Sequence, residues 1–533
     1  MYKYLLWFWF IVIVAEVLPA QHMLLYQNDT LLNYPRKDSA LFQRQMTREI
    51  SVLVSEGYLE AKASDKALGN DTLFCYQLDK GRKFKNVSFS YLVKEGDSTH
   101  RGLKPTEKIL QLANKGYPFA NFTLSELLQD NGKVFVRFYV NSGPRIYFDS
   151  IVGIKALPIK PKAFYNLLGF QPGELYQEKL YRSIPEKLAE IEVVSINTNP
   201  DIGFFADKAQ IYLDMDVNPA SQFDVMVGLQ PASGQSNQSR INGYIDVHLP
   251  NLFRSAINLD FDWRAFGPDA QSVFLETRIP TLGKTGIGAS ANLRLLRQDS
   301  SFVNSTFGTN IITPITPKAH LTIGYDRTNS SRQSSNLSLF SAVQYDWYKL
   351  EICHGCYRSF DTRKRQLAFN VAGGIGAREI TEPDDSNENR SISWKGKAEL
   401  KGSTTLFQNQ LFFAGVFAEV LQNRQELLLN EKFRLGGLQT VRGFYENQFF
   451  ADSYLYMKNE YRLYFEQRSY LFGLADAGWI KSGDFENSFM TPGIGLSLSS
   501  NSGIFKFIFA RGILFGSGQT SSNLIHFGYT AIF

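Results

Sequence analysis

The feature that most constrains this chain is a long series of segments in which apolar and polar residues alternate, from residue 223 onward. Segment 453–465 is typical: Leu455, Met457 and Leu463 are apolar, and charged residues stand between them. Successive side chains of a β-strand point to opposite faces, so each segment predicts a strand with one apolar and one polar face. We count about sixteen such segments, with no convincing helix among them.

Alternation alone fits either a soluble β-sandwich or a transmembrane β-barrel, but the connections distinguish the two. Short turns are predicted at 249–254, 280–284, 313–317, 407–410, 466–468 and 501–503. Longer polar loops are predicted at 232–239, 297–301, 329–336, 382–391, 481–487 and 516–523. Outer-membrane barrels have short turns on one side and long loops on the other, so this pattern favours the barrel. Segment 349–363 departs from the pattern, because it is long on the short-turn side.

The amino terminus resembles an export signal. Lys3 precedes an apolar run from Leu5 to Val14, and Leu18-Pro19-Ala20 offers a cleavage site. A helix that spans a bilayer needs roughly twenty residues, about twice the length of this run. We therefore expect a cleaved signal peptide over residues 1–20, with an uncleaved anchor as the alternative.

Composition agrees with a membrane barrel and excludes other classes. The chain of 533 residues has 14% aromatic residues, 41 glycines and a formal net charge of +5. It is too aromatic for a disordered chain, too polar for a helical membrane protein, and its scattered basic residues suggest no nucleic-acid partner. The histidines show no metal-ligand spacing and no nucleophile–base pair is apparent, so we predict a non-enzyme without a cofactor. Cys353 and Cys356 form either a local disulfide or two free thiols.

Residues 22–218 mix helix and strand in a repeat of roughly 60 residues. Helices predicted at 39–56 and 104–115 end at Gly57-Tyr58 and Gly116-Tyr117, and two alternating segments follow each. A third copy begins near residue 145. The predicted domains are a signal peptide 1–20, modules 22–82, 83–142 and 143–218, and a barrel 219–533.

A loop before segment 453–465 carries two glycine-containing motifs, Arg434-Leu435-Gly436-Gly437 and Val441-Arg442-Gly443-Phe444. An arginine inside a barrel is costly unless it is paired, and its planar guanidinium suits carboxylates. Gly443 allows the backbone to turn tightly, and Phe444 can pack where a charged side chain cannot. A surface turn with an incidental arginine is the alternative.

Together these features resemble the BamA/TamA-type outer-membrane assembly proteins, and the modules resemble POTRA domains. In that family the sixth extracellular loop folds into the barrel lumen, and its arginine meets acidic residues on the following strands. The resemblance therefore implies that Arg442 meets Glu460 and Asp476. It also implies that the last strand, with Tyr529 and a terminal Phe533, acts as an insertion signal.

The fold class implied is a membrane β-barrel of about 16 antiparallel strands, preceded by periplasmic α+β POTRA-like modules. The function implied is the insertion of other barrels into the bacterial outer membrane, or the passage of proteins across it. The partners would be unfolded outer-membrane or secreted proteins, outer-membrane lipid, and periplasmic or lipoprotein accessory factors. The alternatives are a dedicated two-partner-type secretion pore, which usually has two modules and a plugging helix, and a porin-like channel.

A mechanism follows from the edges of the first and last strands, near 222–230 and 524–533. Gly228 and Gly528 weaken the pairing there, since glycine destabilises a strand. A barrel that opens at this seam would offer an unpaired edge to a substrate strand.

The alternation of turns and loops predicts which connections reach the cell surface. Protease-sensitive tags inserted at Asn387 and Asn523 should be cleaved when protease is added to intact cells, because both positions lie in long loops. A tag at Gly503 should be cleaved only after the cells are lysed. Cleavage at Gly503 in intact cells would reverse the topology.

Overall fold

The computed structural model describes residues 21–532 with a number of short gaps. The gaps are residues 27–28, 36–38, 67–72, 93–99, 102, 131–132, 154–156, 231–239, 268–269, 299–300, 317, 333–340, 356–364, 381–389, 438, 467, 501–502 and 516–520. The predicted signal peptide 1–20 and Phe533 therefore lie outside the described residues. Within the described part, no helix is both long enough and apolar enough to span a bilayer.

The chain divides into two compact units. The first comprises Met1–Ala156, Leu168–Ala189 and Ile196–Asp216, and the second comprises Leu157–Leu167, Glu190–Ser195 and Val217–Phe533. The second unit thus joins two short segments of the predicted third module to the barrel.

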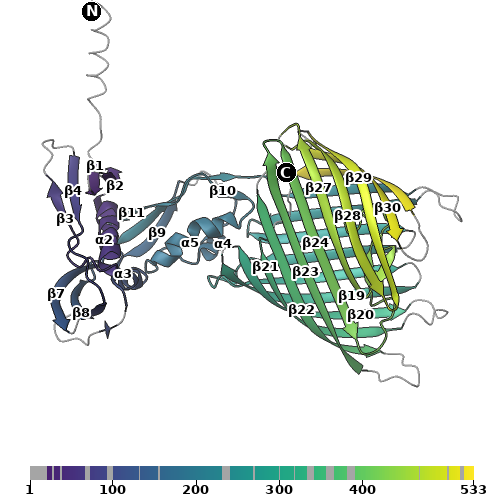
Figure 1. Ribbon diagram of the computed structural model, residues 1–533, viewed down its shortest axis with the longest axis horizontal. Helices are drawn as coiled ribbons and strands as arrows, with labels where there is room; N and C mark the ends of the chain where they lie inside the picture. Colours follow the sequence, from purple (N-terminus) through teal and green to yellow (C-terminus); the bar gives the residue numbers. More distant parts are fainter. Residues whose placement is uncertain are drawn as a thin grey trace, which may run out of the picture. The chain divides into compact units, whose positions relative to one another are not determined.

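Three sheets of three or four strands precede the barrel, one within each predicted module (Figure 1). The first contains β1 (Gln21–Tyr26), β2 (Asp29–Pro35), β3 (Lys62–Lys66) and β4 (Leu73–Asp79), with helix α2 (Ser39–Ser55). The second contains β5 (Val87–Leu92), β6 (His100–Arg101), β7 (Asn121–Asp130) and β8 (Lys133–Asn141), with α3 (Pro105–Ala113). The third contains β9 (Tyr147–Val152), β11 (Asp201–Phe205) and β12 (Lys208–Tyr212). The same stretch of chain also forms α4 (Pro161–Leu168), α5 (Glu178–Ala189) and the paired strands β10 (Val194–Ile196) and β13 (Met215–Val217).

The three sheets share one topology. In each, the first strand runs parallel to the last: β1 beside β4, β5 beside β8, and β9 beside β12. An antiparallel strand then forms one edge, namely β3, β7 or β11. The first two sheets also carry an extra strand on the other edge, β2 or β6, which the sequence analysis missed. The repeated topology fits a string of α+β modules, and their identity as POTRA-like domains stays a prediction.

The two Gly-Tyr pairs end their helices in the same way. Gly57 and Gly116 have φ of +100° and +89°, a region that suits glycine. The amide of Tyr58 then donates to the carbonyl of Leu53, as the amide of Tyr117 does to that of Leu112. The carbonyl of each glycine accepts a backbone hydrogen bond from the following module, from Phe84 and Ile146 respectively. The Gly-Tyr pair therefore both stops the helix and joins it to the next sheet.

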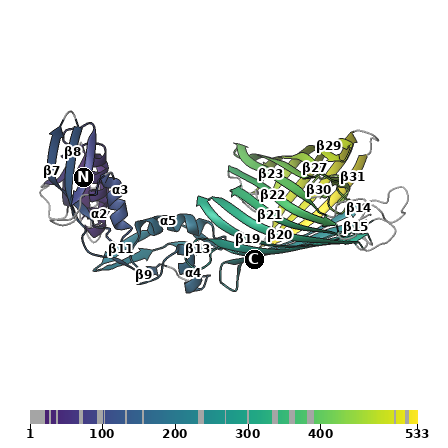
Figure 2. The ribbon, with the colours of Figure 1, turned by 90° about the horizontal axis from the view of Figure 1, so that it is seen from below.

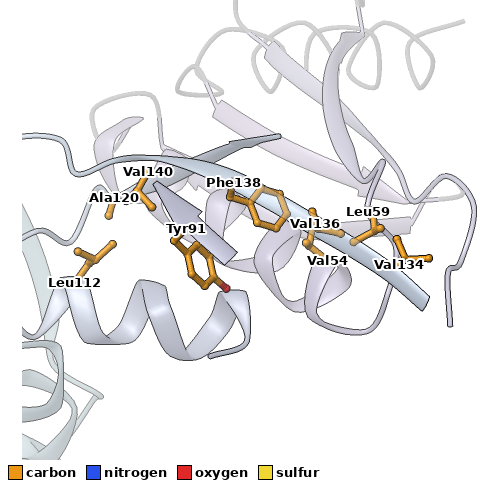
Figure 3. Close-up of a cluster of buried hydrophobic side chains, with 9 residues drawn as sticks. All are labelled: Val54, Leu59, Tyr91, Leu112, Ala120, Val134, Val136, Phe138 and Val140. Carbon is orange, nitrogen blue, oxygen red and sulfur yellow. The ribbon is translucent and has the colours of Figure 1, made fainter. Parts of the chain in front are cut away.

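A buried apolar cluster holds the first two modules together (Figure 3). Val54 lies at the end of α2 and Leu59 follows just after it, and Val134, Val136 and Phe138 come from β8. Every second residue of β8 is buried, which is the period expected of a strand with one covered face. The helix of one module thus covers part of the sheet of the next.

A buried charged group links the first and third modules. Arg44 on α2 forms an ion pair with Glu178, the first residue of α5, and both side chains are less than one-tenth exposed. The Tyr176 hydroxyl and Arg182 Nε also donate to this carboxylate, each at 2.7 Å. Because three donors bind one carboxylate, they offset the free-energy cost of removing its charge from water.

The rest of the described chain is one closed antiparallel barrel of sixteen strands (Figures 1 and 2). The strands are β14 (Gln222–Gln230), β15 (Arg240–Leu252), β16 (Ile257–Gly267), β17 (Ala270–Ile279), β18 (Gly288–Gln298), β19 (Phe302–Thr316), β20 (Ala319–Arg332), β21 (Val343–His354), β22 (Gln366–Ile380), β23 (Arg390–Phe407), β24 (Gln410–Asn423), β27 (Ser453–Tyr464), β28 (Tyr470–Ser482), β29 (Phe485–Ser500), β30 (Gly503–Phe515) and β31 (Ser521–Ile532). β14 pairs with β31 and closes the ring, from Gln222 opposite Ile532 to Leu229 opposite Ile525. The predicted strand count is confirmed.

The two faces of the barrel differ in polarity as predicted. Large apolar side chains such as Ile323, Ile375 and Ile494 point outward and are exposed. Charged side chains such as Lys395 and Glu460 lie on strands whose alternate residues point inward. An exposed apolar belt with every strand paired is the arrangement that a lipid bilayer requires, so this is a membrane barrel.

Two details refine the predicted strands. β21 ends at His354 and β22 begins at Gln366, so the long segment on the short-turn side is a true connection and no strand was misplaced. β31 begins at Ser521, so the predicted loop 516–523 is shorter than expected, and Asn523, which was expected in that loop, lies in the strand opposite Arg511. The glycine cluster 373–376 lies within β22, where Gly376 leaves room for the indole of Trp347.

The Gly57 joint provides a test of the modules. In a fragment of residues 22–218, Gly57→Ala should lower the free energy of unfolding by about 1–3 kcal/mol, because alanine is strained at this φ and its Cβ would meet the Phe84 carbonyl. Gly173→Ala is the matched control, since its φ is +85° but its Cβ would meet nothing within 4 Å. Urea unfolding followed by circular dichroism measures both variants. Equal losses of unfolding free energy in the two variants would contradict the role of Gly57 in joining the modules. A fragment without helix would contradict the predicted α+β modules.

Candidate functional site

The candidate site is the loop between β24 and β27, residues 424–452, which folds inward. It contains a two-stranded hairpin of β25 (Phe433–Leu435) and β26 (Phe449–Ala451). Four apolar residues of the loop are fully buried: Leu435, Val441, Phe444 and Ala451. They pack against inward-facing residues of the wall, namely Tyr456, Ile480 and Phe489. The loop therefore belongs to the interior of the barrel.

Arg442 at the tip of the loop meets the two carboxylates that the sequence analysis named. Its Nε donates to Asp476 Oδ2 at 2.7 Å, and its Nη2 donates to Asp476 Oδ1 at 2.6 Å. Its Nη1 donates to Glu460 Oε1. Asp476 is fully buried and Arg442 is 4% exposed. A bidentate pair with a third charged hydrogen bond is the arrangement that makes a buried guanidinium tolerable.

The charges around this pair form a short network on the wall. Glu460 also accepts from Arg462 Nε at 2.8 Å, so one carboxylate serves two guanidinium groups. Lys458 Nζ donates to the carbonyl oxygen of Gln439 in the loop at 2.6 Å. Burial lowers the pKa of Arg442, but the bonds to Asp476 and the charge of Glu460 outweigh it and raise the pKa above its usual value. The arginine therefore stays charged at every physiological pH.

Three glycines shape the inner part of the loop. Gly436, Gly437 and Gly443 all have φ between +84° and +120°, where other residues are strained. A Cβ on Gly443 would lie 2.7 Å from the backbone nitrogen of Gly512 on β30. The absence of a side chain at Gly443 thus lets the loop backbone touch the wall. Phe444 follows and packs edge-on against Phe449 and Phe489.

The tip also touches the last strand, a contact that the sequence analysis missed. Ser522 Oγ on β31 donates to the carbonyl oxygen of Gly443 at 2.5 Å. Ser522 stands in a polar stretch with no motif, so nothing in the sequence marks it. β31 is also the strand that closes the barrel against β14.

Arg434, at the base of the hairpin, lies between two aromatic rings. Its guanidinium carbon is 4.7 Å from the ring centre of Phe302 and 5.4 Å from that of Phe450. Within the described part of the chain, its buried Nε and Nη2 have no hydrogen-bond partner. Burial lowers the pKa of Arg434 to about 10, so the side chain remains a cation at neutral pH.

The predicted terminal signal is described only in part. Tyr529 lies on β31 opposite Val225 of β14, and its ring centre is 4.9 Å from that of Phe505. Phe533 lies outside the described residues. Across the seam, Gly228 stands opposite His526, and Gly528 opposite Met226.

Two further sequence expectations concern metals and thiols. Among the described residues, no group of histidine, cysteine and acidic side chains could hold a metal ion. Cys353 is disulfide-bonded, which excludes the free-thiol alternative for that residue. Cys356 lies outside the described residues.

Comparison with known proteins gives one family match and several similar folds. The haemolysin secretion/activation protein ShlB/FhaC/HecB family matches residues 321–499, which include Arg442, Glu460 and Asp476. No curated protein matches the chain.

Among solved structures, the chain is similar to CdiB from Acinetobacter baumannii, with a TM-score of 0.55 and 14% identity over 84% of this chain and 90% of that one. CdiB from Escherichia coli gives a TM-score of 0.52 and 14% identity, over 93% and 98% of the two chains. BamA from Haemophilus ducreyi lacking POTRA domains 1–3 gives 0.47 and 14%, over 80% and 92%.

These comparisons bear on three of the sequence expectations. The likeness to CdiB supports the fold, a sixteen-stranded barrel that follows smaller modules. The expected location in the bacterial outer membrane stands. The narrower BamA/TamA assignment is not confirmed, because the family that matches is a secretion family.

The Arg442 pair predicts a characteristic pattern of stability. Asp476→Ala should destabilise the folded barrel, by less than the roughly 3–5 kcal/mol typical of a broken buried pair, because the Arg442 guanidinium keeps its hydrogen bond to Glu460. Arg442→Ala/Asp476→Ala should cost less than the sum of the single changes, since the two residues interact directly. Denaturant unfolding of the purified barrel measures each loss. Strictly additive losses would mean that the pair does not form.

Proposed function

We propose that this chain is an outer-membrane transporter that carries an unfolded protein across the outer membrane, in the manner of a two-partner secretion pore. The observation that carries the proposal is the loop held inside the barrel by Arg442. Such a loop closes the lumen at rest and can be displaced when a substrate enters. The match of residues 321–499 to a secretion family supports the same reading.

The charged hydrogen bonds that hold Arg442 suit a loop that opens reversibly. Arg442 is held by charged hydrogen bonds, and carboxylates of a passing chain can compete for them once water enters the lumen. The wall near the tip also offers polar groups from Lys458 and Arg462. The proposed work is transport rather than catalysis, and it needs no cofactor.

The modules would receive the substrate on the periplasmic side. β3, β7 and β11 form sheet edges, and an extended chain can pair with such an edge. A groove of about 890 Å³ lies where the first module meets the second, with Ser55, Glu56 and Gly57 of the first module in its lining. Aromatic and basic side chains line it, among them Phe84, Phe135, Lys83, Lys85 and Arg137. An unfolded segment with apolar and acidic residues fits this lining. Periplasmic or lipoprotein accessory factors are the other candidates for these surfaces, along with a simple spacer role.

Insertion of other barrels into the membrane is the second candidate, and the seam favours it. Gly228 and Gly528 both lie in the pairing of β14 with β31, where strand glycines lower stability. The flexible side chain of Met226 fills the space beside Gly528. A seam of this kind can open to a substrate strand, and outer-membrane lipid would then receive the new strand. A porin-like channel is the weakest candidate, since it would need neither modules nor an anchored loop.

Depletion in the native host separates these functions. Removing the protein should abolish the secretion of one or a few proteins and leave the abundance of other outer-membrane barrels unchanged. Complementation with the wild-type gene should restore secretion, whereas Arg442→Ala should restore little of it while still reaching the membrane. Proteomics of the culture medium and of the outer membrane measures both effects. A general fall in outer-membrane barrels would instead favour the assembly function.

A further inference from the structure

A second buried ion pair holds the same loop at another point. Arg378 on β22 donates from Nε to Glu431 Oε1 at 2.7 Å and from Nη2 to Glu431 Oε2 at 2.6 Å. Both side chains are only 1% exposed. The two charges are placed the other way round from those at Arg442: here the wall supplies the arginine and the loop supplies the carboxylate.

Every side-chain polar atom of this ion pair has a hydrogen-bond partner. Arg378 Nη1 donates to Gln425 Oε1 at 2.7 Å, so all three nitrogens of the guanidinium are used. Glu431 also accepts from the Tyr345 hydroxyl at 2.5 Å and from the Leu428 amide at 2.7 Å. A buried polar network with every member satisfied specifies one arrangement of its chain.

Neighbouring residues fix the same stretch of loop. Asn430 Nδ2 donates to Ser330 Oγ at 2.6 Å and to the Ser341 carbonyl at 2.9 Å. The Asn430 carbonyl accepts from Asn304 Nδ2 at 2.7 Å. Leu427 packs in a buried cluster with Tyr345 and other inward residues of the wall. We call residues 425–431 the root of the loop, and residues 441–444 its tip.

The root and the tip lie on opposite sides of the ring of strands. The root contacts β19, β20, β21 and β22, which are the sixth to ninth strands of the ring. The tip contacts β27, β28, β29, β30 and β31, which are the twelfth to sixteenth. In a closed ring of sixteen, strands eight positions apart face each other, so the sixth faces the fourteenth and the seventh faces the fifteenth. The loop therefore crosses the lumen from one wall to the other.

We propose that Arg378 and Glu431 are positioning residues that anchor the root, so that the loop opens by swinging its tip while the root stays attached. The inference rests on the proposed transport function, which requires the lumen to clear. The root is the more permanent end because it combines an ion pair, an amide network and apolar burial. The tip also has apolar burial, through Val441 and Phe444, but among the described residues it has no amide network like that of Asn430, and the side chain of its partner Glu460 is 13% exposed.

Two cysteine reporters, one at each end of the loop, test the anchor in outer membranes. The root reporter is Ser330→Cys with Asn430→Cys, which replaces a side-chain contact of 2.6 Å. The tip reporter is Phe444→Cys with Phe489→Cys, whose ring centres lie 5.7 Å apart. Both are made with Cys75→Ala, because Cys75 is a free thiol. Disulfide formation is then followed in each variant.

Arg442→Ala should abolish the tip crosslink and leave the root crosslink at its wild-type level. Arg378→Ala should abolish the root crosslink and leave the tip crosslink. Arg378→Glu with Glu431→Arg should restore the root crosslink, which distinguishes loss of the pair from misfolding. Arg390→Ala is the matched control. Arg390 on β23 pairs with Glu379, the neighbour of Arg378 on β22, but the Arg390 side chain is 79% exposed. This variant should change neither crosslink.

The proposal is overturned if the root crosslink is lost in Arg442→Ala as completely as in Arg378→Ala, since the loop would then move as one body. It is also overturned if Arg378→Ala leaves the root crosslink intact. Neither result depends on a substrate. If both crosslinks behave as expected while depletion affects no secreted protein, the proposed function fails and the anchor stands.

Discussion

The structure depends above all on the need to satisfy backbone hydrogen bonds within a lipid bilayer. Lipid offers no partner for an amide or a carbonyl, so a sheet that crosses it must close upon itself. The pairing of β14 with β31 achieves this closure. Once the ring is closed, the alternation of each strand sends apolar residues to lipid and charged residues to the lumen. Charged side chains in the lumen must therefore pair with one another.

Two arginines meet that requirement in opposite ways. Arg442 belongs to the loop and is held by carboxylates of the wall, whereas Arg378 belongs to the wall and holds a carboxylate of the loop. The guanidinium suits both roles because its planar fork binds a carboxylate through two hydrogen bonds. Apolar residues of the loop then fill the space between the walls, as Leu427 and Phe444 do. The loop is thus packed in the same manner as the core of a soluble protein.

Much of this architecture could be predicted from the sequence, because it follows from short-range periodicity. Alternation over ten or more residues identified the barrel strands, and the Gly-Tyr pairs marked where two helices end. β6 escaped prediction because two residues carry no periodic signal, and β2 because its apolar residues Leu31 and Leu32 are adjacent instead of alternating. The contact of Arg442 with Glu460 and Asp476 came from family resemblance rather than from any pattern in the residues. Arg378 and Glu431 are 53 residues apart, and Gly443 and Ser522 are 79 apart, so only the closed ring brings each pair together.

The contact of Ser522 with Gly443 gives the loop a mechanical role as well as a blocking one. Because the loop is tied to opposite walls, it acts as a cross-brace that limits the circumference of the ring. Widening the ring by a guest strand between β14 and β31 would pull these two ends apart and load the brace. Clearing the lumen and opening the seam between β14 and β31 therefore require the same event: one end of the loop must detach from the barrel wall.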